Sequence, residues 1–292
     1  MHNSPEATFK QGAKTFSLAA IFFPKEKWTD VTFIYQWCRY CDDYVDELGK
    51  SPKFLLQETE LAFRQSDSNA SPFHSLSLVF NKYGIPPLYA YELIQGLEMD
   101  HESVRYETMS ELKLYCYRVA STVGLMLCYI MGIFHISALE KAANLGMAMQ
   151  LTNIARDVKE DFGRGRIYLP LEWVRANGIT PESLMTDKGK LFEVVKKLLK
   201  EAECLYESGL KGIEFLPLRS AFVICIAGLA YREIGRKILL VGPEALDRRV
   251  SVTRGRKFQL IVLALFMIAA SLSKRTLRRR KTISISQKWS FA

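Results

Sequence analysis

The sequence predicts a single all-helical domain, and three observations support this fold class. Strand patterns are scarce, whereas long segments repeat apolar residues with helical periodicity. The chain has 292 residues, 49% of them hydrophobic and 24% charged, so it can bury a large core and is not a disordered chain. Prolines fall between the periodic segments, at Pro24, Pro86, Pro87, Pro170, Pro181 and Pro243.

The periodic segments predict ten helices. They lie near residues 11–21, 28–48, 52–66, 73–83, 87–100, 110–133, 137–162, 190–212, 217–239 and 253–273. We expect a folded domain over residues 1–273 and a polar, basic tail over 274–292. The apolar run Leu260–Leu272 has 13 residues, fewer than the ~20 that cross a bilayer, so we expect a core helix. A membrane-inserted hairpin is the alternative.

The net charge of +9 is concentrated at the carboxyl end of the chain. After Asp247 there are 12 basic residues and no acidic one, which leaves 28 basic and 31 acidic residues before it. Such an end suits an anionic membrane surface or a nucleic acid, and a solvated tail is the alternative. A nucleic-acid-binding module would need this charge on a folded face, so we expect no nucleic acid partner.

The cysteines and the amino terminus point to a cytosolic protein. Cys38 and Cys41 are the only close pair, and no second pair or nearby His completes a zinc site. We therefore expect all six cysteines to be reduced and mostly buried thiols. The amino-terminal segment lacks an apolar stretch, so no secretory signal is expected.

A first acidic stripe lies at the end of an apolar, aromatic segment. Arg39, Asp42 and Asp46 are spaced i, i+3, i+7 and so share one face of the predicted helix. Two carboxylates one turn apart can bind Mg²⁺, which prefers oxygen ligands and completes its shell with substrate phosphate oxygens. The alternative is a solvated acidic helix end, because Asp43 and Glu47 lie beside the stripe.

A second stripe lies in the helix predicted over 137–162. Its members are Gln150, Asn153, Asp157 and Asp161. No ionisable side chain occurs between Lys141 and Arg156, so the two amides should face a buried space, where metal-bound water or diphosphate would satisfy them. The alternative is a pair of core amides bonded to the backbone. Two stripes that are both rich in oxygen ligands favour a functional site.

Two acidic stripes facing each other across a bundle predict a reaction class. Mg²⁺ held between them would make a diphosphate a leaving group, and the resulting carbocation would need a dry, aromatic-lined cavity. Residues 115–132 suit such a wall, with Tyr115, Tyr117 and Tyr129 offering π-faces to a cation. A closely packed core helix with small residues at a helix crossing is the alternative.

Basic and hydroxyl side chains near these stripes are candidates for binding phosphate. In Gly163–Pro170 the glycines end the helix, which frees Arg166 to reach a diphosphate; for Arg164 we favour a helix cap paired with the helix end. Thr15, beside Lys14 at a predicted helix start, offers a hydroxyl and backbone donors to an anion.

Several segments together resemble the squalene/phytoene synthase family, in the form found in bacterial phytoene synthases. They are AKTFSLAAIFFP (13–24), YQWCRYCDDYVDE (35–47), LIQGLEMDHESVRYET (93–108), YCYRVASTVGLM (115–126), QLTNIARDVKEDFGRGRIYLPLEW (150–173) and, more weakly, VSVTRGRKF (250–258). They cover most of the chain in the family's order. The resemblance implies an isoprenoid-synthase helical bundle with a central cavity and a catalytic domain over residues 1–273.

The resemblance also implies roles for individual residues. Asp42, Asp46, Asp157 and Asp161 match the catalytic aspartates, which with Asn153 bind Mg²⁺, or alternatively Mn²⁺. Tyr115 matches a catalytic cavity tyrosine. The residues matching or suited to diphosphate contact are Thr15, Arg39, Gln150, Arg156 and Arg166. Ser121 replaces the family's usual glycine and would narrow the cavity.

The implied reaction joins two geranylgeranyl diphosphates head to head. A cyclopropyl diphosphate forms and then rearranges to phytoene in carotenoid biosynthesis, without NADPH. The alternatives are a C15-using dehydrosqualene or squalene-type synthase, a presqualene diphosphate synthase, and an inactive helical scaffold that docks on membrane. An insoluble product and the basic tail predict a cytoplasmic protein associated peripherally with the membrane surface.

Overall fold

The computed structural model describes the backbone of residues 25–64 and 72–289 and the side chains of residues 26–64 and 72–272. Within these residues every regular element is helical, which confirms the predicted all-α class. The elements are α3 (Lys25–Asp46), α4 (Lys53–Arg64), α5 (Pro72–Tyr83), α6 (Leu88–His101), α7 (Met109–Cys116), η1 (Tyr117–Ser121), α8 (Thr122–Ile130), α9 (Ile136–Gly163), α10 (Leu171–Ala176), α11 (Lys188–Gly209), η2 (Leu210–Phe215), α12 (Leu218–Val241), η3 (Gly242–Leu246) and α13 (Arg254–Trp289).

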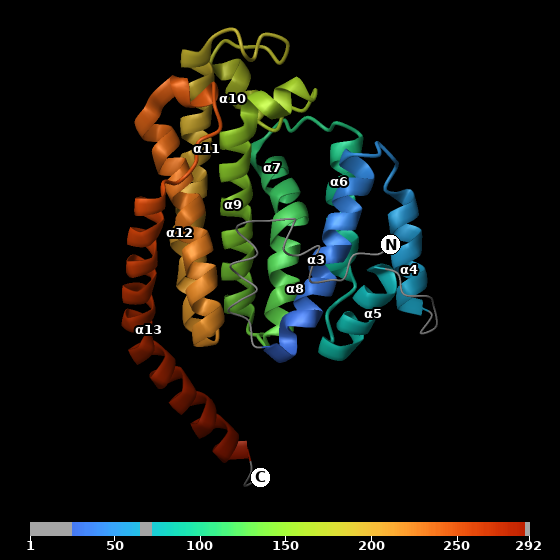
Figure 1. Cartoon of the computed structure of the whole chain (residues 1–292), viewed down its shortest axis with the longest axis vertical. Helices are drawn as coiled ribbons and strands as arrows, with labels where there is room; N and C mark the ends of the chain where they lie inside the picture. Colours follow the sequence, from blue (N-terminus) through green and yellow to red (C-terminus); the bar gives the residue numbers. More distant parts are fainter. Residues whose placement is uncertain (1–24, 65–71, 290–292) are drawn as a thin grey trace.

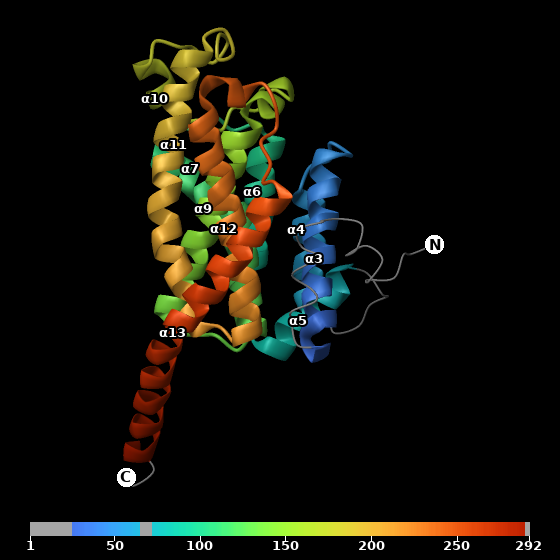
Figure 2. The ribbon, with the colours of Figure 1, turned by 60° about the vertical axis from the view of Figure 1, so that its left-hand side comes forward.

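The long helix α9 is the centre of the bundle (Figure 1). It packs against α11 and α12 on one side and against α8 and η1 on the other. Helices α3, α4, α5 and α6 form the far side, and α13 lies on the outer surface of α12 (Figure 2). Helices α3 and α9 both end at the upper end of the bundle, and the segment that follows α9 reaches α3 through a contact between Arg166 and Asp46.

The helix predicted over 110–133 is interrupted in its middle. Residues Tyr117–Ser121 form a π-helix, η1, between α7 and α8. Two glycines let neighbouring helices approach it closely: a Cβ on Gly96 would lie 2.7 Å from Val119 Cγ1, and one on Gly146 would lie 2.7 Å from Ser121 Cα. The extra residue per turn in a π-helix re-aims the side chains on either side of it.

Ser121 is part of this helix crossing. It is buried, and its hydroxyl donates a hydrogen bond of 2.6 Å to the backbone carbonyl of Ala143 in α9. The expectation that Ser121 narrows a cavity is therefore wrong, because its side chain lies between η1 and α9. For this part of residues 115–132 the alternative of a closely packed helix crossing is confirmed.

The expectation that Leu260–Leu272 is a core helix is wrong. Residues Arg254–Leu272 have a mean hydropathy of 1.6, yet only 17% of this stretch is buried. Counted with its first four residues, three of which are basic, the stretch is long and apolar enough to cross a membrane by length and composition alone. The helix also continues past residue 273, without a break, to Trp289. The division of the chain at residues 273 and 274 remains a prediction, and the helix predicted over 11–21 lies outside the described residues.

The η1–α9 crossing gives a stability prediction. Replacing Gly146 with Ala should destabilise the fold by about 1–3 kcal/mol, because the new methyl group would meet Ser121 backbone atoms that cannot move independently. Gly163→Ala in the same helix is the matched control, since nothing lies within 4 Å of its Cβ position. Urea unfolding of both variants measures the difference, and equal midpoints would contradict the crossing.

Candidate active site

The first acidic stripe lies at the carboxyl end of α3. Residues Ile34, Trp37 and Cys41 on the opposite face are fully buried, which fixes the rotation of the helix and turns Asp42 and Asp46 away from the core. Partial burial, and then the like charge of Asp46, raises the pKa of Asp42 to about 6. The charged form of Asp42 is therefore unfavourable here unless a cation lies nearby to stabilise it.

Two arginines offset part of the negative charge of the first stripe. Arg39 donates a hydrogen bond of 3.0 Å from Nη1 to Asp42 Oδ2, and it also forms ion pairs with Asp43 and Glu47. Arg166, which follows α9, donates a 2.6 Å hydrogen bond from Nη2 to Asp46 Oδ1 on α3. This contact ties the end of α9 to the end of α3. The polar cavity here has a volume of about 540 Å³ and is lined by Arg39, Asp42, Asp43, Asp46, Glu47, Arg164 and Arg166.

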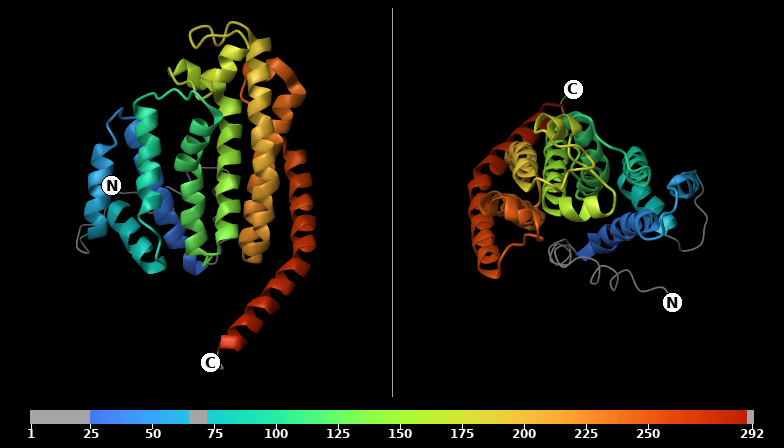
Figure 3. Two further views of the ribbon diagram at one scale, coloured as in Figure 1. Left: turned by 180° about the vertical axis from the view of Figure 1, so that it is seen from behind. Right: turned by 90° about the horizontal axis from the view of Figure 1, so that it is seen from above.

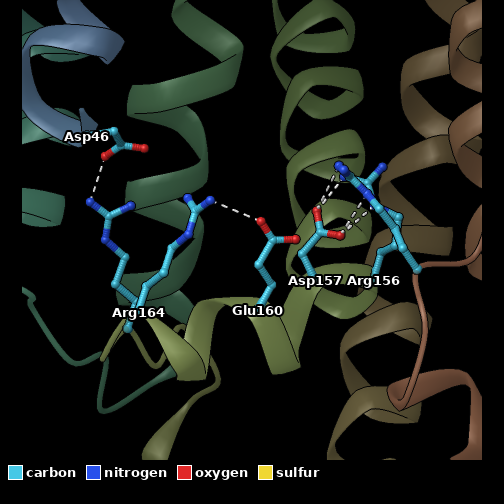
Figure 4. A network of polar contacts seen from close by, with 7 residues as sticks. Asp46, Arg156, Asp157, Glu160 and Arg164 are labelled. Atoms are coloured by element: carbon cyan, nitrogen blue, oxygen red, sulfur yellow. Dashed lines mark hydrogen bonds and ion pairs between the residues drawn. The ribbon is translucent and has the colours of Figure 1, made fainter.

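The second acidic stripe lies towards the carboxyl end of α9, and Figure 4 shows Glu160 and Arg164 between its Asp157 and Asp46 of the first stripe. Arg156 donates a 2.8 Å hydrogen bond from Nε to Asp157 Oδ1, and Arg249 from the segment before α13 also approaches this oxygen, with its Nε 3.3 Å away. Burial, and then the like charge of Asp157, raises the pKa of Asp161 to about 7. The positive charge of Arg166 acts on both stripes, because it lowers the pKa values of Asp42 and of Asp161 and so offsets part of their rise.

The two amides of the second stripe bond to each other. Asn153 donates from Nδ2 to Gln150 Oε1 over 3.3 Å. The other polar atom of Asn153, Oδ1, is buried and has no hydrogen-bond partner among the described residues. A buried carbonyl oxygen without a donor is costly, and a cation or a metal-bound water would satisfy it.

Asp100 is a site residue that the sequence analysis missed. It lies near the end of α6 and accepts hydrogen bonds from two tyrosines, at 2.9 Å from Tyr115 Oη and at 2.6 Å from Tyr168 Oη. The rings of Tyr115 and Tyr168 stack with their centroids 5.0 Å apart, and Tyr106 stacks on Tyr168. Burial raises the pKa of Asp100 to about 6. The available signal was weak, because Asp100 follows the apolar run that includes Leu93, Ile94 and Leu97 as one of three closely spaced acidic residues, with Glu98 and Glu102.

The remaining candidates are placed as follows. Arg164 caps α9 and pairs with Glu160 over 3.0 Å, which confirms the capping role favoured for it. Tyr129 lies at the carboxyl end of α8, where its ring packs edge to face against the rings of Tyr89 and Phe134. Thr15 lies outside the described residues. All six cysteines are free and four of them are buried, whereas Cys204 is exposed.

The donor set fits a hard divalent cation. Carboxylates with raised pKa values and an unpartnered amide oxygen are the oxygen ligands that Mg²⁺ prefers. Among the described residues, no three carboxylate, histidine or cysteine side chains converge into a ready-made metal cluster. Mg²⁺ commonly binds one or two protein carboxylates and completes its shell with water and substrate phosphates.

Comparison with known proteins identifies the family of this chain. The family model described as squalene/phytoene synthase matches residues 9–256. A 15-cis-phytoene synthase of Enterobacter agglomerans is 37% identical over 268 residues, which covers 87% of this chain and 91% of that protein. One from Pantoea ananas is 35% identical over 278 residues and covers 90% of each chain. The chain therefore belongs to the squalene/phytoene synthase family and is a prenyltransferase of that family.

Solved structures give the same fold. A dehydrosqualene synthase crystallised with a ligand superposes with a TM-score of 0.81 at 29% identity, covering 91% of this chain and 95% of that one. A squalene synthase, HpnC, from Alicyclobacillus acidocaldarius superposes with a TM-score of 0.75 at 21% identity, covering 81% of this chain and 92% of that one. The second likeness shows the fold alone.

The raised pKa values predict how stability depends on pH. Because the pKa values of Asp42 and Asp161 are higher in the folded than in the unfolded protein, the folded form takes up protons first, and metal-free protein should become more stable as the pH falls from 8 towards 5. Asp161→Asn should raise the melting temperature at pH 8 and flatten this dependence. Thermal melts in EDTA measure both effects; a melting temperature that rises with pH over this range would contradict the assignment.

Proposed function

We propose that the protein condenses two geranylgeranyl diphosphates head to head, through a cyclopropyl diphosphate, to give phytoene. The observation that carries this proposal is that both acidic stripes lie at one end of the bundle with arginines beside each of them, and that Arg166, which follows the second stripe, bonds to Asp46 of the first. This arrangement supplies oxygen ligands for a metal and guanidinium groups for a diphosphate in one place.

The residues divide the work of the first ionisation. Mg²⁺ bound by the aspartate stripes would neutralise the diphosphate and make it a leaving group. Arg39 and Arg166 already lie at the first stripe, and both can turn from carboxylate to diphosphate oxygens once a metal takes over their partners. Gln150 and Asn153 hold each other in place one to two turns before Asp157 and offer an amide oxygen to the same region.

The tyrosine cluster is proposed to serve the carbocation. Asp100 fixes the hydroxyl groups of Tyr115 and Tyr168, so their stacked rings keep one orientation. A ring held in this way would stabilise an allylic cation placed beside it without reorganising. Each half of the reaction releases one diphosphate and one proton, and no reductant enters the balance.

The substrate length is proposed from the relatives. The two curated proteins at 35–37% identity are named 15-cis-phytoene synthases, which favours the C20 substrate. The ligand-bound structure at 29% identity is a dehydrosqualene synthase, which keeps the C15 substrate as the second candidate. Both reactions would use the same acidic stripes and differ in the length of apolar chain that must be enclosed.

The product identifies the reaction. We expect purified protein with Mg²⁺ and geranylgeranyl diphosphate to form phytoene, and farnesyl diphosphate to be converted more slowly, both without NADPH. Chromatography with mass spectrometry of the extracted hydrocarbons measures this. A product saturated at its centre only when NADPH is present would indicate a squalene-type enzyme, and a cyclopropyl diphosphate as the end product would indicate a presqualene-type enzyme.

The metal dependence can be tested on single residues. Asp157→Asn should lower kcat/KM by at least about 10²-fold, because the variant lacks a carboxylate that would hold the metal and, through it, the departing diphosphate. Glu160→Gln is the matched control in the same helix, where the carboxylate pairs with the cap residue Arg164. Circular dichroism checks the fold. Full activity of the Asp157 variant, or of wild type in EDTA, would overturn the metal assignment.

We also propose that the protein works at the cytoplasmic face of a membrane. A C40 hydrocarbon is insoluble in water, and the chain after Asp247 carries 12 basic residues and no acidic one. A segment of this charge is attracted to anionic headgroups within about a Debye length, ~8–10 Å.

A further inference from the structure

Helix α13 is apolar on two faces, but only one face is covered by protein. Leu260, Ala264 and Ser271 are buried where α13 packs on α12 and η2. On the other side Phe258, Leu265 and Phe266 are 68%, 54% and 69% exposed. A helix that is apolar all round is normally covered on all sides, by protein or by lipid. The outer face of α13 therefore lacks a covering partner within the described chain.

The end of the bundle that lies opposite the acidic stripes exposes further large apolar side chains. Helices α6, α9 and α12 all begin at the lower end in Figure 1, opposite the acidic stripes. The first residue of each is an exposed aliphatic side chain: Leu88 is 55%, Ile136 is 72% and Leu218 is 52% exposed. Phe134, in the turn between α8 and α9, is 58% exposed. These four residues form what we call the apolar rim.

Helix α13 runs past this rim and projects beyond the bundle (Figures 1 and 3). Residues 258–272 contain no charged side chain. They are preceded by Arg254, Arg256 and Lys257, and in residues 274–281, which continue the helix, six of the eight residues are Lys or Arg. An apolar stretch with basic residues on both sides matches a bilayer surface with anionic headgroups.

We infer that the outer face of α13 and the apolar rim together form the surface that docks on an anionic lipid bilayer. With the rim at the headgroups, the carboxyl-terminal half of the apolar stretch of α13 would enter the lipid beside it, with its outer face in contact with acyl chains. The acidic stripes, at the other end of the bundle, would then face the aqueous phase, from which charged diphosphates arrive. This inference deepens the location proposed above and does not rest on the reaction itself.

The geometry favours an interfacial helix over a spanning one. The uncharged stretch of α13 has 15 residues, a length of about 22 Å, which is short of the ~30 Å hydrocarbon core. Its inner face is also packed on α12, so the helix could cross the bilayer only by leaving the bundle. If one face of the helix stays on protein and the other contacts lipid, the stretch does not have to span the hydrocarbon core and the helix does not have to leave the bundle.

Vesicle flotation of the full chain, without substrate, tests the surface. Wild type should float with vesicles of phosphatidylcholine and phosphatidylglycerol, and less with phosphatidylcholine alone. The double variant Leu265→Gln/Phe266→Gln should lose at least about 10-fold in partitioning, since it removes the two largest exposed side chains from the middle of the face. Leu61→Gln/Leu78→Gln is the matched control: both leucines are exposed, at 45% and 52%, on α4 and α5.

Brominated lipids test the orientation. Ile136→Trp in the rim should gain emission that brominated acyl chains quench, whereas Leu48→Trp, just after α3 at the acidic end, should gain emission that they do not quench. Equal flotation of the two double variants, or quenching at position 48 and not at 136, would overturn the inference. So would a stable dimer in solution that the Leu265/Phe266 variant abolishes while flotation is unchanged, because a second copy would then cover the face.

Discussion

The arrangement of this protein depends on balancing carboxylates that are crowded together and partly removed from water. Asp42, Asp46, Asp157 and Asp161 come from two helices that finish at the same end of the bundle, and burial together with repulsion within each stripe raises the pKa values of Asp42 and Asp161. Such a cluster is tolerated only where cations compensate it. Arginines do so here, and Arg166 spans the two helices by bonding to Asp46. Since an arginine can exchange one anionic partner for another, this balance is also what prepares the site to accept a diphosphate.

Much of this site follows from helical spacing. Residues three, four and seven apart share a face, so the sequence alone predicts that Asp42 lies with Asp46, and that Asn153 lies with Asp157 and Asp161. The end of α9 was equally predictable, because Gly163 and Gly165 stop the helix and release Arg166 towards α3. Gly165 has a φ of +78°, a conformation that glycine adopts without strain.

Other features depend on which elements meet, and no local pattern encodes that. Asp100 matters because its partners Tyr115 and Tyr168 arrive from two other segments, 15 and 68 residues away along the chain. The π-helix at Tyr117–Ser121 arises where Gly96 and Gly146 admit two neighbours at once. Hydropathy identified α13 as apolar but could not show whether protein covers it, because periodicity reports where apolar residues lie and not what packs on them.

The two ends of the bundle have opposite chemistry, and the direction of α13 reinforces that difference. The four aspartates lie at one end, while the most basic part of the sequence continues along a helix that leaves from the other. If the basic segment folded back over the aspartates, it would compete with metal and substrate for the same oxygens. Instead Arg249 alone, from the segment before α13, joins Arg156 at Asp157 among the described contacts. Arg256 pairs with Glu233, and most of the other basic residues after Asp247 come in the sequence after Leu272, along the part of α13 that leaves the bundle. On the arrangement that we propose, one chain keeps an anion-binding end in water and offers an apolar, basic end to lipid.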